Sequence, residues 1–148
     1  MYSQSDLHVS DVYAWALQNA ELIRQRRFNE IDIDNVAEAL ESVGRHEQQA
    51  LQECLIGLLA RLLRWRHQLT RRERSWQTQI QDQRAQLQEI FAKNPSLRTG
   101  LDALVDDAYG SGRVKAARDA NLNLDTFPQD CPFQAEQILD QDFWPGPH

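Results

Sequence analysis

The sequence has few cysteines and no long apolar run, and both absences exclude classes of protein. Its 148 residues include two cysteines, Cys54 and Cys131, which are too few and too far apart for the disulfide framework of a small secreted domain. The longest apolar stretch, residues 54–60, falls short of the ~20 residues that span a bilayer. Residues 1–10 lack the cationic start of a signal peptide. We therefore expect a cytoplasmic protein with free thiols and no membrane contact.

Recognisable catalytic motifs are also missing. The sequence has no Gly-rich phosphate loop, no His-Glu-x-x-His and no Gly-x-Ser-x-Gly. Cys54 stands where a core residue belongs, and Asp130 beside Cys131 is expected to raise the pKa of that thiol. Glu41 and His46 are five residues apart, whereas a helical metal site needs three. We expect no catalytic residue, no bound metal and no cofactor.

Strand-like alternation of apolar and polar residues is absent too, so the expected fold class is all-α. An apolar fraction of 41% and a charged fraction of 26% are typical of a globular protein. A chain of this length can bury one core. We predict a single domain over residues 1–148, an antiparallel bundle of four main helices with a short C-terminal helix and a packed irregular tail.

Capping residues and turn formers set the expected helix bounds. The first helix follows Ser10 or Asp11 and runs to about Arg27, and Asp34 caps a long second helix. A capping box at residues 70–73 begins the third helix, and Asn94-Pro95 ends the third helix and begins the fourth. The short last helix runs from Pro132 to Leu139. Gly44 marks a bend or break, and Gly110 with Gly112 leaves open whether residues 114–120 continue the fourth helix.

Apolar spacing gives each helix an inward face. In the second helix, the segment from Cys54 to Leu63 should be the most buried element, with Gly57 allowing close packing. The expected apolar positions are Tyr13, Ala16, Ala20 and Ile23 in the first helix, Val36, Leu40, Val43, Leu51, Cys54, Leu58, Leu62, Trp65 and Leu69 in the second, Trp76, Ile80, Leu87, Ile90 and Phe91 in the third, and Leu97, Leu101, Leu104, Val105, Ala108 and Tyr109 in the fourth. Phe127, Phe133, Phe143 and Trp144 indicate that the tail packs on the helices.

Charge is distributed unevenly along the chain. Residues 1–44 carry a net charge of −5, residues 45–98 of +5 and residues 99–148 of −6. The interpretation that we favour is that the acidic ends fold over the basic middle and neutralise it. The other interpretation is an external binding site for an anion.

The densest local signal is residues 61–76, with six arginines and two tryptophans. Arginine forks match phosphate or carboxylate oxygens, and tryptophan stacks on bases or on arginine. The candidate patch for an anion or partner is Arg64, Trp65, Arg71, Arg72, Arg74 and Trp76. The alternative, which we favour, is that both tryptophans are core anchors and the arginines pair with internal carboxylates.

Short motifs along almost the whole chain are similar to a known family. They are Tyr13-Ala14-Trp15, residues 35–38, residues 41–44, residues 62–65, residues 74–76 with Ile80, Phe127-Pro128, Cys131-Pro132 and Asp142-Phe143. In these motifs the chain resembles the bacterial helical proteins of domain-of-unknown-function family twenty-nine, which are common in cyanobacteria. The resemblance implies an all-α domain and supplies no catalytic residue. The chain has Arg61 where the family often has His, and Phe133 where it often has Trp.

Three functions are consistent with these features. The first is a small helical interaction or regulatory protein that binds another protein. The second is nucleic-acid binding through residues 61–76, and the third is an enzyme or metal protein whose site is assembled from distant residues. The sequence leaves the identity of the partner and the oligomeric state open.

Overall fold

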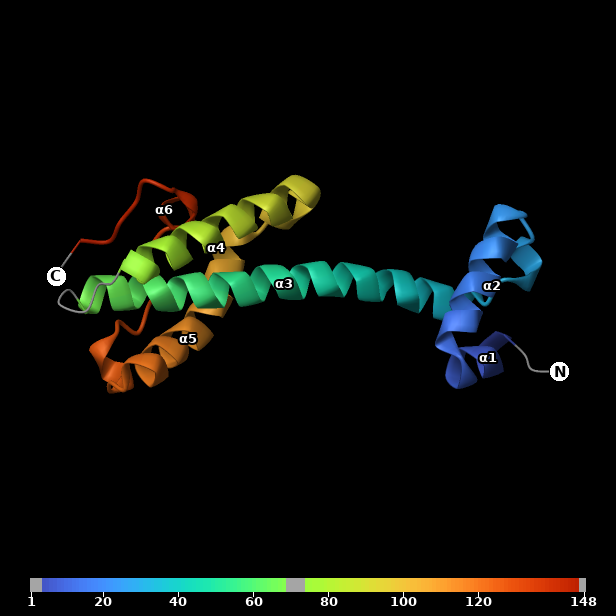
Figure 1. Ribbon diagram of the computed structural model, residues 1–148, viewed down its shortest axis with the longest axis horizontal. Coiled ribbons are helices and arrows are strands. Elements are labelled where there is room, and N and C mark those ends of the chain that lie inside the picture. The colour runs from blue at the N-terminus through green and yellow to red at the C-terminus, as the bar shows by residue number, and fades with distance from the viewer. Residues whose placement is uncertain (1–3, 69–73, 147–148) are drawn as a thin grey trace. The chain divides into compact units, whose positions relative to one another are not determined.

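Figure 1 shows the computed structural model, in which residues 4–68 and 74–146 are described. Within those ranges the chain forms helices and no strand, which confirms the all-α prediction. The elements are α1 (Gln4–Ser10), α2 (Val12–Arg24), η1 (Phe28–Glu30), α3 (Ile33–His67), α4 (Arg74–Lys93), η3 (Pro95–Arg98), α5 (Leu101–Ala120), η4 (Leu124–Thr126) and α6 (Ala135–Leu139). They fall into two compact units, residues 1–46 and 47–148. The single domain stays a prediction.

The first unit begins with a helix that the sequence pattern did not predict, α1. Asp11 caps α2 as expected, because its Oδ1 accepts a hydrogen bond of 3.0 Å from the backbone N of Ala14. The helix ends at Arg24, before the predicted Arg27. Arg26 has a left-handed backbone with φ of 60°, a conformation that commonly follows the last turn of a helix.

The buried face of α2 differs from the predicted one. The buried residues are Trp15, Asn19 and Leu22, while Tyr13 is 75% exposed and Ile23 is 42% exposed. Two hydrogen bonds to Asp32 determine which face of α2 is buried. Trp15 Nε1 donates to the carboxylate of Asp32 at 2.9 Å, and Asn19 Oδ1 accepts from the backbone N of Asp32 at 2.9 Å. The prediction was wrong because it followed apolar spacing alone, and a buried asparagine does not appear in such a pattern.

Helix α3 starts one residue before the predicted cap. Asp32, and not Asp34, holds the capping position, because its carbonyl accepts from the backbone N of Val36 at 2.9 Å and its carboxylate accepts from Asn35 Nδ2 at 2.8 Å. The helix continues through Gly44 without a break. Its early apolar positions are not buried: Leu40 is 68% exposed and Val43 is 63% exposed.

In the second unit, α4 and α5 pack on the C-terminal half of α3, as Figure 1 shows. The segment from Cys54 to Leu63 is the centre of the core, as predicted, and Leu55, Leu58, Leu59, Leu62 and Leu63 are each 0% exposed. On α4, Ile80, Leu87, Ile90 and Phe91 are buried as expected.

Helix α5 is continuous through Gly110 and Gly112, which answers the open question about residues 114–120. Gly112 lies so close to α3 that an added Cβ would stand 3.1 Å from Leu59 Cβ and 3.2 Å from the carbonyl O of Ile56. The helix starts at Leu101 and not near Leu97, because Pro95 opens a separate 3-10 turn and Gly100 turns the chain with φ of 78°.

The C-terminal segment packs against the helices, as its aromatic residues predicted. Phe127 is 1% exposed and Phe133 is 6% exposed, and the rings of Trp144 and Trp65 lie 4.8 Å apart. Helix α6 begins at Ala135, after Pro132, where Gln134 and Gln137 form a capping box.

Arg84 on α4 is a buried residue that the sequence pattern did not predict. It is 0% exposed and donates through Nε to the carbonyl O of Ile138 at 2.8 Å and through Nη2 to that of Gln137 at 3.3 Å. Burial lowers the pKa of Arg84, and the nearby Asp140 opposes that effect. This arginine therefore ties the end of α6 to the core of the second unit.

Candidate functional site

The structure brings together two of the six predicted patch residues, Arg64 at the end of α3 and Trp76 at the start of α4. The guanidinium carbon of Arg64 lies 4.6 Å from the centroid of the Trp76 ring, the geometry of a cation–π contact. Arg71 and Arg72 lie outside the described residues, as does the predicted cap at Thr70. The pairing of Arg64 with Trp76 marks the position of a cleft.

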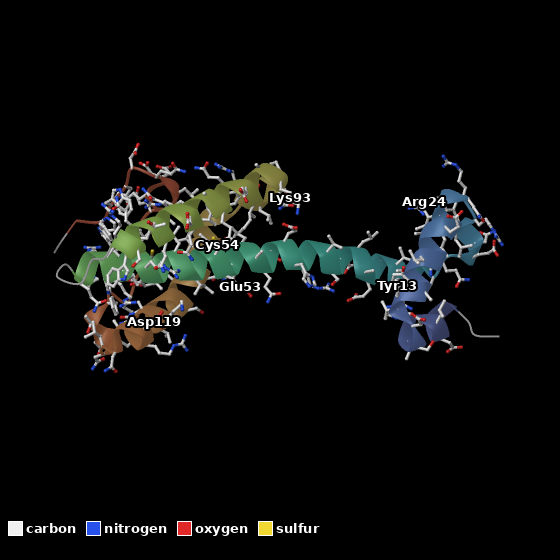
Figure 2. All side chains as sticks on the ribbon, viewed as in Figure 1. Tyr13, Arg24, Glu53, Cys54, Lys93 and Asp119 are labelled. Carbon is white, nitrogen blue, oxygen red and sulfur yellow. The ribbon has the colours of Figure 1, made fainter. Side chains whose placement is uncertain are left out.

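This cleft, which we call the arginine cleft, has a volume of about 370 Å³. Helices α3, α4 and α5 supply its walls, and Asp119 of α5 is labelled in Figure 2. The lining residues are Ala60, Arg61, Arg64, Ser75, Trp76, Gln79, Lys115 and Asp119. Three cations and one carboxylate therefore face a single hollow.

Neutral groups hold both arginines of the arginine cleft. Arg64 Nε donates to Gln68 Oε1 at 2.9 Å, and Arg61 Nε donates to Gln79 Oε1 at 3.2 Å. Lys115 pairs with Asp119 at 3.2 Å, so the one acid among the described lining residues is already matched by a cation. The two guanidinium groups supply the excess positive charge.

Trp65 and Arg74 lie apart from the arginine cleft. Trp65 contacts Trp144 and is partly buried against the core, which is the anchoring role that we favoured for it. Trp76 is half-buried, but its ring supports Arg64 and lines the cleft. Arg74 is exposed at the first residue of α4.

Within the described ranges, no carboxylate pairs with the described arginines of the basic segment. Among residues 4–68 and 74–146, no carboxylate oxygen lies within 4 Å of Arg61, Arg64, Arg66 or Arg74. The hydrogen bonds and ring contacts described for Arg61, Arg64 and Arg66 are with neutral polar groups and aromatic rings. The described residues therefore give no support to internal pairing for these four arginines, and that interpretation stays a prediction.

The sequence carried a signal for part of this cleft. Arg61 and Arg64 are three residues apart, so they lie on one side of a helix. Lys115 and Asp119 stand on α5, far away in sequence, and nothing in their local pattern connects them to the basic segment. Tertiary packing alone places them there.

The two thiols do not resemble nucleophiles. Burial raises the pKa of Cys54 to about 11. Burial also raises the pKa of Cys131, and the carboxylate that adds to this effect is Asp106 and not the neighbouring Asp130 that we expected. Both cysteines are free.

The acidic residues near His46 are engaged in other contacts. Arg45 lies 2.8 Å from a carboxylate oxygen of Glu38 and 3.8 Å from one of Glu41, and the ring Nδ1 of His46 lies 2.7 Å from the carbonyl O of Ser42. In the described part of the chain, no three side chains of His, Cys, Asp or Glu are grouped as a metal would need.

A second surface of interest lies on α3 within residues 1–46. Ile33, Leu40 and Val43 are 64%, 68% and 63% exposed, and Val36 between them is half-buried. These four residues, which we call the α3 seam, recur at intervals of three and four residues, the spacing of a helix-packing stripe. Figure 2 labels Tyr13 on the neighbouring α2, where Leu17 is also exposed at 55%.

Comparison with known proteins identifies the family. The family model described as "Domain of unknown function DUF29" matches residues 7–144. The chain belongs to this family. The match spans both units and includes the arginine cleft and the α3 seam, so neither is an addition outside the family's domain. No curated protein and no solved structure matches the chain.

Of the helices in the described ranges, none is both long enough and apolar enough to pass through a bilayer.

Proposed function

We propose that this protein is a non-catalytic helical module of the bacterial cytoplasm that binds another protein through the α3 seam. The observation that carries the proposal is the exposure of Leu40 and Val43, at 68% and 63%, on the same helix whose later leucines are fully buried. Exposed apolar side chains that line up on one helical face are typical of protein-binding surfaces.

The residues beside the α3 seam leave room for a close partner. Ala37 and Ala39 flank the stripe with small side chains, and a Cβ added at Gly44 would meet nothing within 4 Å. Helices approach most closely where such small residues border the contact. An amphipathic helix from the partner fits a stripe of this spacing.

Charge favours a different protein over a second copy of this chain. Residues 1–46 carry eight acidic and four basic side chains, a net charge of −4. Two copies brought together through this unit would repel each other, whereas a helix with lysine or arginine beside its apolar face would be attracted. The expected partner segment is therefore a basic amphipathic helix.

The test is capture of the tagged chain from its own cells after mild crosslinking. The variant L40S/V43S should lose the partner by about tenfold or more, because both side chains leave the interface. The control Val114→Ser changes an apolar residue that is 51% exposed on α5, in the other unit, and should keep the partner. Circular dichroism checks that both variants remain helical.

The captured protein is then identified, and a synthetic peptide of its basic amphipathic helix is titrated into the purified chain. Binding that L40S/V43S removes and Val114→Ser retains supports the proposal. Equal binding by both variants contradicts it. A homodimer in light scattering that L40S/V43S dissociates also contradicts it, since a second copy would then occupy the seam.

A second candidate function is nucleic-acid binding through residues 61–76. The observation in its favour is that the described arginines of this segment have no carboxylate partner among residues 4–68 and 74–146, and one of them, Arg64, stacks on Trp76. Affinity for a single-stranded oligonucleotide should fall steeply with salt and weaken when Arg71, Arg72 and Arg74 become alanine. Undetectable or salt-independent binding removes this candidate.

A further inference from the structure

We infer that the arginine cleft binds a phosphate group through the paired guanidinium groups of Arg61 and Arg64. This site lies in residues 47–148 and does not depend on the protein interface proposed for the first unit.

Arg64 is held in place on two sides. Its Nε is bonded to Gln68 at 2.9 Å, and the Trp76 ring supports its guanidinium plane at 4.6 Å. Among the described residues, neither terminal nitrogen of Arg64 has a hydrogen-bond acceptor. A guanidinium fixed through Nε and its face, with the outer edge available, is suited to an oxyanion that accepts two parallel hydrogen bonds.

Arg61 adds a second guanidinium one turn earlier on α3. Its Nε donates to Gln79 at 3.2 Å and its Nη1 to the carbonyl O of Gly57 at 3.5 Å. Within the described ranges its Nη2 has no acceptor. Among the described residues, three terminal nitrogens from two arginines therefore have no acceptor and are available to a ligand in this cleft.

The charge of the arginine cleft matches a phosphate better than a carboxylate. Arg61, Arg64 and Lys115 supply three positive charges, and Asp119 supplies one negative charge that Lys115 already pairs with. The remaining charge of +2 is complementary to a phosphate monoester, which carries about −1.5 to −2 at neutral pH. A single carboxylate would leave one cation without a counter-charge.

The volume of the cleft limits the size of the molecule that carries the phosphate group. A volume of about 370 Å³ is near the lower end of the range for small-molecule sites, roughly 300–1,000 Å³. A phosphate group of this kind could belong to a small phosphorylated molecule or to a nucleic-acid chain. The experiment therefore uses a probe for each source.

Isothermal titration measures binding of inorganic phosphate, and fluorescence anisotropy measures binding of a labelled single-stranded oligonucleotide of twelve thymidines. Arg64→Ala should weaken binding about tenfold or more, because it removes charge-assisted hydrogen bonds to the phosphate. The matched control is Arg98→Ala. Arg98 also stacks on an aromatic ring, at 4.9 Å from the centroid of Phe91, but it does not line the cleft.

A second variant changes the affinity in the opposite direction. Asp119→Asn removes the one carboxylate among the described lining residues and releases Lys115, so phosphate should bind several-fold more tightly. Misfolding does not produce tighter binding, so this variant remains informative if Arg64→Ala is unstable.

Saturable binding of inorganic phosphate that Arg64→Ala weakens and Arg98→Ala does not supports the site and a small-molecule source. Arg64-dependent binding of the oligonucleotide alone supports the site and a nucleic-acid source. Absence of binding by both probes overturns the inference. Equal loss in Arg64→Ala and Arg98→Ala, or weaker binding by Asp119→Asn, also overturns it.

Discussion

The two units of the molecule differ in which side chains are exposed and which arginines form ion pairs. In residues 1–46, apolar side chains such as Leu40 are exposed, while Arg24, Arg27 and Arg45 each pair with a glutamate. In residues 47–148, the leucines of α3 are buried, while Arg61 and Arg64 have no carboxylate partner in the described part of the chain. Each unit thus leaves one kind of group available, and the two kinds suit different partners.

Figure 2 shows the difference at labelled positions. Arg24 extends outward from the end of α2, where it lies 3.7 Å from Glu21, and Cys54 belongs to the covered face of α3. A partner helix with an apolar face is expected at the first unit, and an anionic ligand is expected at the second.

The largest effect is expected from leucine truncation at two positions of one helix. Leu58→Ala removes a side chain that is 0% exposed and should lower the free energy of unfolding by about 2–5 kcal/mol, because a cavity is left in the core. Leu40→Ala, where the leucine is 68% exposed, should change it by less than about 0.5 kcal/mol. Urea denaturation measures both. Equal losses would show that the α3 seam is covered within the folded chain.

Arginine truncation gives the next largest difference. Arg84→Ala leaves a cavity and two carbonyl groups without a donor, so it should cost about 2–4 kcal/mol. Arg45→Ala removes ion pairs to Glu38 and Glu41 whose side chains are more than half exposed, so it should cost about 1 kcal/mol or less. Thermal unfolding followed by circular dichroism checks both values. A smaller loss for Arg84→Ala than for Arg45→Ala would refute the structural role of the buried arginine.

Replacing each of two glycines of α5 with alanine should change the free energy of unfolding in opposite directions. Gly112→Ala forces a Cβ against Leu59 and the backbone of Ile56, and should cost about 1–3 kcal/mol. Gly110→Ala meets nothing within 4 Å and should raise helix stability by up to about 1 kcal/mol. Midpoints of denaturant unfolding distinguish them. Stabilisation by both alanines would mean that α5 does not approach α3 closely.

The smallest expected effect is a shift of the pKa of one carboxylate in each unit. Hydrogen bonds from Asn35 and then Trp15 lower the pKa of Asp32, and the bonds from Lys93 and then Asn94 lower the pKa of Glu47. A carboxyl with a lowered pKa in the folded state adds stability above its ordinary pKa, and this stability is lost as the pH falls through the folded value.

Carboxyl NMR titrations between pH 6 and pH 2 measure both groups, with sodium chloride at about 0.05 and 0.5 M. Salt should move the pKa of Glu47 upward more than that of Asp32, because Lys93 is charged whereas Asn35 and Trp15 are neutral donors. Asp32→Asn serves as the control that removes the first signal. An equal salt response at both groups would contradict these assignments.

Much of the second unit could be predicted from its leucines. The spacing of Leu55, Leu58 and Leu62 placed the centre of the core correctly, and Ile80 and Leu87 placed the inner face of α4. Arg84 was missed because an arginine within a polar run is usually exposed, and its carbonyl acceptors lie more than fifty residues later. In the first unit, the inner face of α2 was misplaced because Asn19 and Trp15 are fixed by Asp32.

The helical class, the buried leucines of α3 and the position of the basic segment follow from the amino-acid sequence, since helical periodicity and composition are local properties. Which apolar stripe is covered and which arginine is buried depend on how the helices pack, and so does the meeting of Lys115 and Asp119 with Arg61 and Arg64 in one cleft. The physical reason is that burial and charge pairing depend on which distant segments meet, and a local pattern does not specify that meeting.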